Sequence, residues 1–246
     1  MSFNYEKDGD KIAVINSDKR QKKVYFSESD DGKQDIILKA SEQFMLSPDK
    51  NTERITMYVC GSAGSGKSYF VAQYCEEYHK TFKSNQIYLI SENDEDKAFD
   101  SKDYIKRIEI SDLDSNPLDW KEFQDCLIIF DDIDSIKGKL GKTIDDMRDK
   151  LLKNSRKFRV SVISTSHDAC GIKLKSVLNE SKTIVFFMMN YNRSLKYLLE
   201  NYLGLSKNVI EKLKNSKSRW TAFTKSYPSY LVQQRLITTI PKLERN

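Results

Sequence analysis

Long apolar runs are missing from this sequence of 246 residues. A helix needs about 18 or more apolar residues in succession to cross a bilayer, and no such run is present, so a membrane span is not expected. The first ten residues are polar and acidic, without the basic and apolar blocks of a secretory signal peptide. We therefore expect a protein that works inside a cell or a virion.

Histidine and cysteine are both scarce. Two histidines, His79 and His167, argue against a histidine-rich metal enzyme. The cysteines form no CxxC pair, so neither a zinc site nor a disulfide framework is indicated. Three of the four lie among apolar residues, as buried thiols do in a reducing compartment. The cysteines are Cys60, Cys75, Cys126 and Cys170.

Charge and hydropathy set broad limits on the class of protein. Apolar residues make up 39% of the chain and aromatic residues 11%, which supports a substantial core and excludes a disordered polymer. The net charge is +5 at pH 7. This mildly basic balance permits nucleic-acid binding, but a solvated surface rich in lysine has the same balance.

The pattern of the chain changes near residue 54. Residues 1–54 contain three short β-like runs, at 12–15, 24–27 and 35–38, and we interpret them as a small β-rich N-terminal extension. Residues 55–246 form the main predicted domain, in which buried strands alternate with helices. Strands are expected at 55–60, 86–90, 105–110, 127–130, 160–164, 183–188 and within 219–240, and helices at 68–82, 143–153 and 192–213.

This alternation predicts an α/β fold with a mainly parallel sheet flanked by helices. Thr143 and Asp146 have the spacing of a capping box at the start of the 143–153 helix. The helical region at 192–213 is expected to break near Gly204.

Residues 61–68 match the phosphate-binding pattern G-x-x-x-x-G-K-[ST], between a predicted strand and a predicted helix. The glycines let the backbone turn tightly and bring its N–H groups against phosphate oxygens. The helix adds its positive N-terminal end. Lys67 is expected to reach the β- and γ-phosphates of ATP, and Ser68 to bind Mg²⁺. The predicted nucleotide-binding residues are Gly61, Ser62, Ala63, Gly64, Ser65, Gly66, Lys67 and Ser68. The motif predicts a P-loop NTPase.

An apolar strand that ends in acids, residues 127–132, supplies the second half of the predicted site. Asp131 is expected to hold Mg²⁺, through water. Asp132 would orient or deprotonate the attacking water, although a glutamate is commoner in that role and Asp134 competes for it. Either acid could instead only cap a turn. A carboxylate beside the γ-phosphate favours hydrolysis.

The strand at 160–164 ends in Thr165, Ser166 and His167, and in a doubly wound sheet such an end lies beside the nucleotide. Thr165 and Ser166 are the first candidates to sense the γ-phosphate, with His167 next; ordinary capping of the strand end is the alternative. Arg156, near the end of the 143–153 helix, could reach the ATP site of a neighbouring subunit, or could only complement the helix dipole. Lys157 and Arg159 stay open as alternatives for the cation that acts on the neighbour.

A loop with three lysines and two glycines is expected at residues 137–142, after the magnesium aspartate. In a ring, this loop could line the channel and grip a phosphate backbone. The alternative is a mobile solvated loop.

Together these motifs resemble those of viral genome-packaging ATPases of the FtsK–HerA type, especially the poxvirus-like branch of large DNA viruses and virophages. The resemblance covers roughly residues 55–235. Its matching pieces are residues 61–68, the strand end at Phe130, Asp131 and Asp132, the basic segment at Arg156 that leads into residues 160–167, and Ser218, Arg219 and Trp220 followed by Tyr227 and Pro228.

The resemblance implies a homo-oligomeric ring, a pentamer or hexamer, that hydrolyses ATP to drive double-stranded DNA into a preformed capsid. It implies a capsid, portal or vertex protein as partner and a location in the virion or host-cell cytoplasm. It assigns phosphate and Mg²⁺ contact to Lys67 and Ser68, Mg²⁺ to Asp131, water to Asp132 and a candidate arginine finger to Arg156. Two departures stand out: the wider superfamily often has glutamine at the end of the sensing strand, and the catalytic acid here is not glutamate.

Other functions remain as alternatives. Another P-loop ATPase, such as an AAA-like remodeller or a helicase loader, fits the same motifs. A P-loop kinase would need a lid, and no arginine-rich lid segment is present. A GTPase should carry an N-K-x-D-like motif after a strand, and the asparagine-rich stretch at 190–193 does not fit it. The paired acids Asp131 and Asp132 argue against a non-enzymatic adaptor.

Overall fold

The computed structural model describes residues 1–16, 21–115 and 118–245. The chain divides into two compact units. The P-loop unit is Thr52–Lys182, and the composite unit combines Met1–Asn51 with Thr183–Asn246. The domain boundary expected between residues 54 and 55 stays a prediction. The composite unit contains both the N-terminal residues and the last quarter of the chain.

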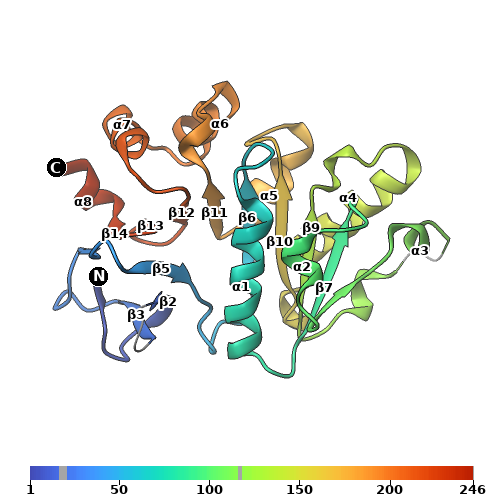
Figure 1. Cartoon of the computed structure of the whole chain (residues 1–246), viewed down its shortest axis with the longest axis horizontal. Helices are drawn as coiled ribbons and strands as arrows, with labels where there is room; N and C mark the ends of the chain where they lie inside the picture. Colours follow the sequence, from blue (N-terminus) through green and yellow to red (C-terminus); the bar gives the residue numbers. More distant parts are fainter. Residues whose placement is uncertain (17–20, 116–117, 246) are drawn as a thin grey trace. The chain divides into compact units, whose positions relative to one another are not determined.

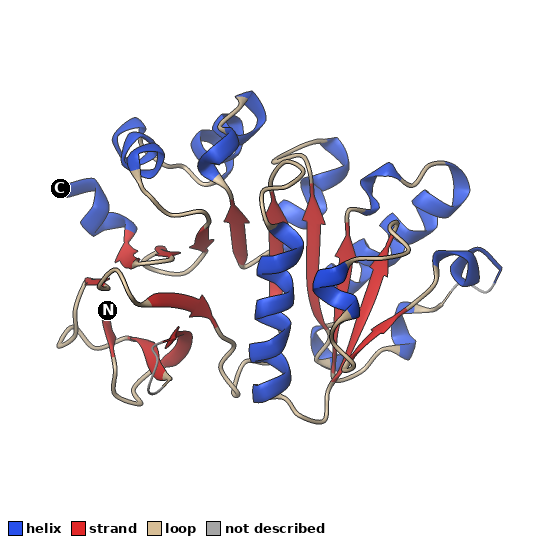
Figure 2. Ribbon diagram, in the orientation of Figure 1, coloured by secondary structure: helices blue, strands red, loops and turns tan. Residues whose placement is uncertain are grey.

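The P-loop unit is built on a parallel sheet in the order β6-β10-β9-β7-β8. All six residues of β9 are buried, as expected of a strand covered on both faces. The strands are β6 (Thr56–Cys60), β7 (Gln86–Ser91), β8 (Ile105–Arg107), β9 (Cys126–Asp131) and β10 (Ser161–Ser166). The predicted α/β architecture with a parallel sheet is confirmed here (Figures 1 and 2).

Helices cover both faces of this sheet. The chain leaves β6 through α1 toward β7 and returns from β9 through α4 to β10, in opposite directions across the sheet. Right-handed crossovers therefore put α1 and α4 on opposite faces, and Figure 1 shows α1 running along the strands. The helices are α1 (Lys67–Thr81), α2 (Lys97–Asp100), α3 (Ile110–Ser115), α4 (Gly138–Asn154) and α5 (Lys175–Glu180). Short 3-10 turns are η1 (Trp120–Glu122), η2 (Ile133–Ser135), η3 (Arg156–Phe158) and η4 (Ile172–Leu174).

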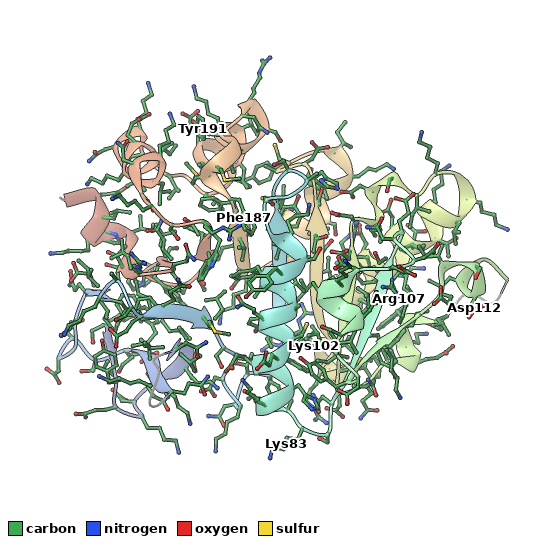
Figure 3. The ribbon with its side chains drawn as sticks, in the orientation of Figure 1. Lys83, Lys102, Arg107, Asp112, Phe187 and Tyr191 are labelled. Atoms are coloured by element: carbon green, nitrogen blue, oxygen red, sulfur yellow. The ribbon has the colours of Figure 1, made fainter. Side chains whose placement is uncertain are left out.

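The β8 edge of the sheet holds the acidic segment that follows β7. Arg107 pairs with Asp100 of α2 at 2.8 Å and donates to the backbone oxygen of Asn93 at 2.7 Å, in the region marked by Arg107 and Asp112 in Figure 3. The strand expected at 105–110 ends early, because Ile110 already begins α3.

The expected start of the 143–153 helix was wrong. α4 begins at Gly138 with Lys137 as its N-cap, so most of the expected lysine loop is helical. Thr143 lies inside the helix and donates to the backbone oxygen of Lys139 at 3.1 Å, so it does not cap. A Cβ on Gly141 would lie 2.1 Å from the backbone oxygen of Ile136. This glycine therefore permits a close approach at the helix start, and does not mark a loop.

The composite unit is mainly antiparallel. One sheet has the order β1-β3-β2-β5, and a second run of strands has the order β4-β14-β13-β12-β11. Phe3, Phe26 and Tyr230 form an aromatic cluster between them, with ring centroids 4.7 to 5.8 Å apart. The strands are β1 (Ser2–Asn4), β2 (Asp10–Asn16), β3 (Lys22–Ser27), β4 (Asp35–Ile37), β5 (Gln43–Leu46), β11 (Thr183–Phe186), β12 (Thr221–Thr224), β13 (Tyr230–Gln233) and β14 (Leu236–Thr239). The predicted β-rich character of the N-terminal residues is confirmed.

The helical region of the composite unit is broken, as expected. A π-turn at Leu198–Tyr202 follows α6, and Gly204 then adopts a φ of 63° before α7 begins. These helices are α6 (Arg193–Tyr197), α7 (Lys207–Asn215) and α8 (Ile240–Arg245). Within the described ranges, no helix combines the length and the apolar character needed to cross a bilayer.

Candidate nucleotide-binding site

The P-loop joins the carboxyl end of β6 to the amino end of α1. The Gly61 N–H donates to the backbone oxygen of Ser166 at 3.1 Å, which ties the loop to the end of β10. Gly64 and Gly66 adopt φ values of 73° and 104°, a left-handed conformation that glycine tolerates best. The Ser65 Oγ is buried and has no hydrogen-bond partner among the described residues. The loop therefore retains an unsatisfied polar group that a ligand oxygen or water could partner.

Lys67 is the first residue of α1, and its side chain is only 5% exposed. Its Nζ lies 3.0 Å from the backbone oxygen of Gly61 and 3.5 Å from Asp132 Oδ2. It also lies 3.3 Å from His167 Nδ1. The structure therefore brings together the P-loop lysine, the acid after β9 and the histidine after β10.

Asp131 ends β9 and is fully buried. Burial raises the pKa of its carboxyl to about 6, and the neighbouring charge of Asp132 adds to the rise. The Thr165 hydroxyl donates to Asp131 Oδ1 at 2.8 Å, which opposes the rise. Burial makes the ionised form of this carboxylate unfavourable. This fits a cation-binding role, because a divalent cation would stabilise the charged form.

Mg²⁺ needs few protein ligands, since it keeps several waters and takes phosphate oxygens. Ser68, the second residue of α1, and Asp131 supply the hydroxyl and carboxylate oxygens that this ion prefers. These two residues would hold Mg²⁺, and their chemistry fits the ion.

Asp132 adopts a left-handed backbone conformation with φ 47°. For a residue other than glycine this is a strained geometry, of the kind often found at functional sites. Its N–H donates to Thr165 Oγ1 at 2.9 Å, and its Oδ2 lies 3.1 Å from His167 Nε2. Thr165 thus connects to both acids and fixes their relative position. The γ-phosphate-sensing role expected for Thr165 stays a prediction.

Three other polar residues lie at or near the carboxyl ends of these strands: Ser166, Asp134 and Ser91. Ser166 is fully buried, and its Oγ accepts the N–H of Asp168 at 3.1 Å, which is the strand-end capping considered as the alternative. Asp134 is exposed on η2. Ser91, which the sequence did not single out, ends β7 opposite Asp131, and its Oγ lies 3.5 Å from Asp131 Oδ2. A polar residue at the end of the strand next to β9 was the signal that could have identified it.

Arg156 lies away from this cluster. It belongs to η3, which precedes the amino end of β10, whereas Lys67 follows the carboxyl end of the parallel strand β6. Its side chain is 74% exposed and pairs with Glu53 at 2.6 Å. Arg159 pairs with Asp125 through two hydrogen bonds, of 2.5 and 2.8 Å. Any action of Arg156 at a nucleotide would therefore be on another subunit, and that role stays a prediction.

The Sputnik virophage protein named "Uncharacterized protein V3" is 32% identical over 250 residues, and the match covers 98% of this chain and 100% of the relative. The chain belongs to the family of this virophage protein. No protein-family model matches the sequence.

Solved structures share the fold of this family member. The genome packaging NTPase B204 from Sulfolobus turreted icosahedral virus 2, in complex with ATP-gammaS, has a TM-score of 0.51 at 17% identity, and the match covers 77% of this chain and 99% of that one. ATPases 2 and 3 of EssC from Geobacillus thermodenitrificans have a TM-score of 0.52 at 13% identity, covering 81% of this chain and 42% of that one. These similarities confirm the predicted P-loop NTPase fold.

Proposed function

We propose that this protein is an ATP-hydrolysing motor that moves double-stranded DNA, and that its task is to package a viral genome into a preformed capsid. The observation that carries the proposal is the meeting of Lys67, Asp131 and Asp132 at one edge of the parallel sheet. The fold shared with the packaging NTPase B204 supports the motor, and the virophage origin of the 32% identical relative supports the viral setting.

ATP and Mg²⁺ are the expected ligands of this edge. The backbone of residues 61–66 binds the phosphates, and Lys67 moves from its present contacts onto the β- and γ-phosphates. Ser68 and Asp131 would hold Mg²⁺, and the bound ion would offset the charge of the phosphate oxygens. Asp132 lies next to the magnesium ligand and, within the left-handed turn, directs a carboxylate oxygen toward Lys67.

Exposed lysines at the start of α4 are the proposed contact to DNA. Lys137, Lys139 and Lys142 are exposed, and the first turn of this helix contains no acid. Cations at a helix N-terminus are unfavourable, because that end already carries positive partial charge. Phosphate groups of a DNA backbone would relieve the repulsion, with release of counterions.

We expect long double-stranded DNA to stimulate ATP hydrolysis, with a steep dependence on protein concentration as subunits assemble. Lys67→Ala is the blank, because it removes the cation that contacts the phosphates. The triple variant K137Q/K139Q/K142Q should keep DNA-free turnover and lose most of the stimulation. The matched control K83Q/K106Q/K121Q removes three exposed lysines elsewhere in the P-loop unit and should behave like wild type.

Hydrolysis that is indifferent to DNA would contradict the motor proposal and favour an AAA-like remodeller or a helicase loader. If DNA still stimulates the triple variant, the motor proposal stands, but these three lysines do not form the DNA contact.

The motor is proposed to assemble as a homo-oligomeric ring, a pentamer or hexamer, and to dock on a capsid, portal or vertex protein. Arg156 is the proposed finger that acts on a neighbouring subunit, since its guanidinium is exposed and pairs with Glu53 at the surface. Mixing Arg156→Ala chains with Lys67→Ala chains should then restore part of the activity. Arg159→Ala, which also breaks a surface ion pair, is mixed with Lys67→Ala in the same way, because Arg159 is an alternative cation for this role. Rescue with Arg159→Ala in place of Arg156→Ala would assign the role to Arg159. No rescue at any mixing ratio would contradict the role in trans.

A further inference from the structure

The imidazole of His167 lies between the P-loop lysine and the acid after β9. His167 Nδ1 is 3.3 Å from Lys67 Nζ, and His167 Nε2 is 3.1 Å from Asp132 Oδ2. Three separate segments of the chain therefore meet at one ring: the P-loop, the turn after β9 and the turn after β10.

The partners of the ring decide its tautomer. A lysine ammonium has only donors, so Nδ1 must accept from Lys67. An ionised carboxylate has only acceptors, so Nε2 must carry the hydrogen and donate to Asp132. These two contacts fit the Nε2–H tautomer, with its lone pair on the nitrogen that faces Lys67.

Exposure separates the two groups that could accept a proton from water. The Asp132 side chain is 15% exposed and the His167 side chain is 52% exposed. Asp132 Oδ2 is already engaged by both His167 and Lys67, and its Oδ1 lies 3.2 Å from the Thr165 hydroxyl. An incoming water therefore reaches the imidazole more readily than the carboxylate.

We propose that His167 is the general base of ATP hydrolysis and that Asp132 is a positioning residue which holds the imidazole in the required tautomer. This inference rests on the proposed ATPase function and assigns the base within it. It also explains why an aspartate can stand at position 132, where glutamate is commoner. The aspartate side chain is one methylene shorter than that of glutamate, and the imidazole of His167 spans the remaining distance to the water. The same division of labour between carboxylate and imidazole operates in serine hydrolases.

The proton balance is complete. When the phosphates draw the ammonium of Lys67 away, Nδ1 loses its donor and its lone pair is free to accept. The water oxygen bonds to the γ-phosphorus, the bond between that phosphorus and the bridging oxygen breaks, and ADP leaves with the bond's electrons. One water proton passes to Nδ1 and the other stays on the phosphate. The imidazolium charge is stabilised by Asp132 at Nε2 and is lost when the ring releases its proton to solvent.

The first test needs no nucleotide. The chain has two histidines, so ¹⁵N-detected NMR of the ligand-free protein, recorded at a pH above the ordinary range of imidazole titration, resolves one site of interest and one internal reference. His79 stacks on Tyr104 at 4.3 Å and serves as that reference. We expect His167 to be the Nε2–H tautomer and its shifts to change in Asp132→Asn, with those of His79 unchanged. An Nδ1–H tautomer for His167 would overturn the proposal.

The second test separates basicity from positioning. In His167→Gln, the side-chain amide can still donate to Asp132 and accept from Lys67, but it cannot take up a proton near neutral pH. We expect kcat to fall by about 10²- to 10⁴-fold, with the affinity for ATP within about threefold of wild type, a threefold change being worth less than about 0.7 kcal/mol. Added imidazole should restore part of the turnover of His167→Ala, and His79→Gln should turn over normally.

The outcomes separate the base from the ATPase function itself. If His167→Gln turns over ATP within about threefold of wild type, the assignment of His167 as the general base is wrong, while the proposed ATPase function still stands. A wild-type chain that does not turn over ATP would overturn both.

Discussion

Replacing Asp131 by asparagine should stabilise the ligand-free protein above pH 6 and at the same time greatly slow Mg²⁺-dependent ATP hydrolysis. The substitution keeps the shape of a fully buried side chain and keeps an acceptor for the Thr165 hydroxyl. The substitution removes the negative charge of a carboxylate that the fold shields from water. Turnover should drop on the order of 10³-fold, because a bound metal supplies several kcal/mol of transition-state stabilisation.

The pH dependence of the stability gain follows from proton linkage. Burial raises the pKa of Asp131 from 3.8 to about 6, so the folded state binds this proton more tightly than the unfolded state does. The free energy of unfolding therefore falls as pH rises from 4 to 6, and the cost is fully present above pH 6. A shift of about two units corresponds to roughly 3 kcal/mol. Asparagine also buries an amide, so the expected net gain is about 2 kcal/mol.

Urea unfolding of the ligand-free protein, without Mg²⁺, measures this gain between pH 4.5 and 8. The difference between Asp131→Asn and wild type should grow across that range and level off. Asp168→Asn removes an exposed carboxylate from the same edge of the sheet and should change stability little at any pH. A constant difference between Asp131→Asn and wild type would show that the buried charge is not its cause.

Thr165→Val should destabilise the protein by about 2 to 4 kcal/mol, although valine has almost the same shape as threonine. The hydroxyl donates to Asp131 Oδ1 at 2.8 Å and accepts the Asp132 N–H at 2.9 Å. Valine leaves both groups unpartnered beside a buried strand end, and each such loss costs about 1 to 3 kcal/mol. The pKa of Asp131 should also rise further, because this hydrogen bond opposes the rise that burial causes.

Thr165→Ser is the matched control, since it keeps the hydroxyl and removes only a methyl group. Urea unfolding should place this variant well above Thr165→Val in stability. ATP turnover should follow the same order, with a loss of about 10²-fold in the valine variant, because misplacing catalytic groups by about 1 Å has effects of that size. Equal stability of the two variants would mean that the hydroxyl does not hold the two acids.

The lysines at residues 137–142 illustrate where local pattern misleads. Glycine and lysine in alternation are typical of a loop, yet α4 begins at Gly138. Gly141 is required because a Cβ at this position would lie 2.1 Å from the backbone oxygen of Ile136. The atom that a larger residue would meet lies in the turn after β9, so the composition of residues 137–142 does not reveal the requirement. Propensity is a weak guide wherever the packing of a neighbouring segment sets the backbone.

The P-loop, the acidic end of β9 and the alternation of strands with helices could all be predicted from the order of the residues. These are local properties: the phosphate loop needs its glycines and lysine in consecutive order, and a buried strand needs a continuous apolar run such as residues 126–130. Tertiary structure alone decided that Ser91 and His167 contact the two acids and that Thr165 ties those acids together. It also decided that residues 1–51 join residues 183–246 in one compact unit. The physical reason is that strand order and register set which strand ends are neighbours, and these depend on contacts between residues far apart in the chain.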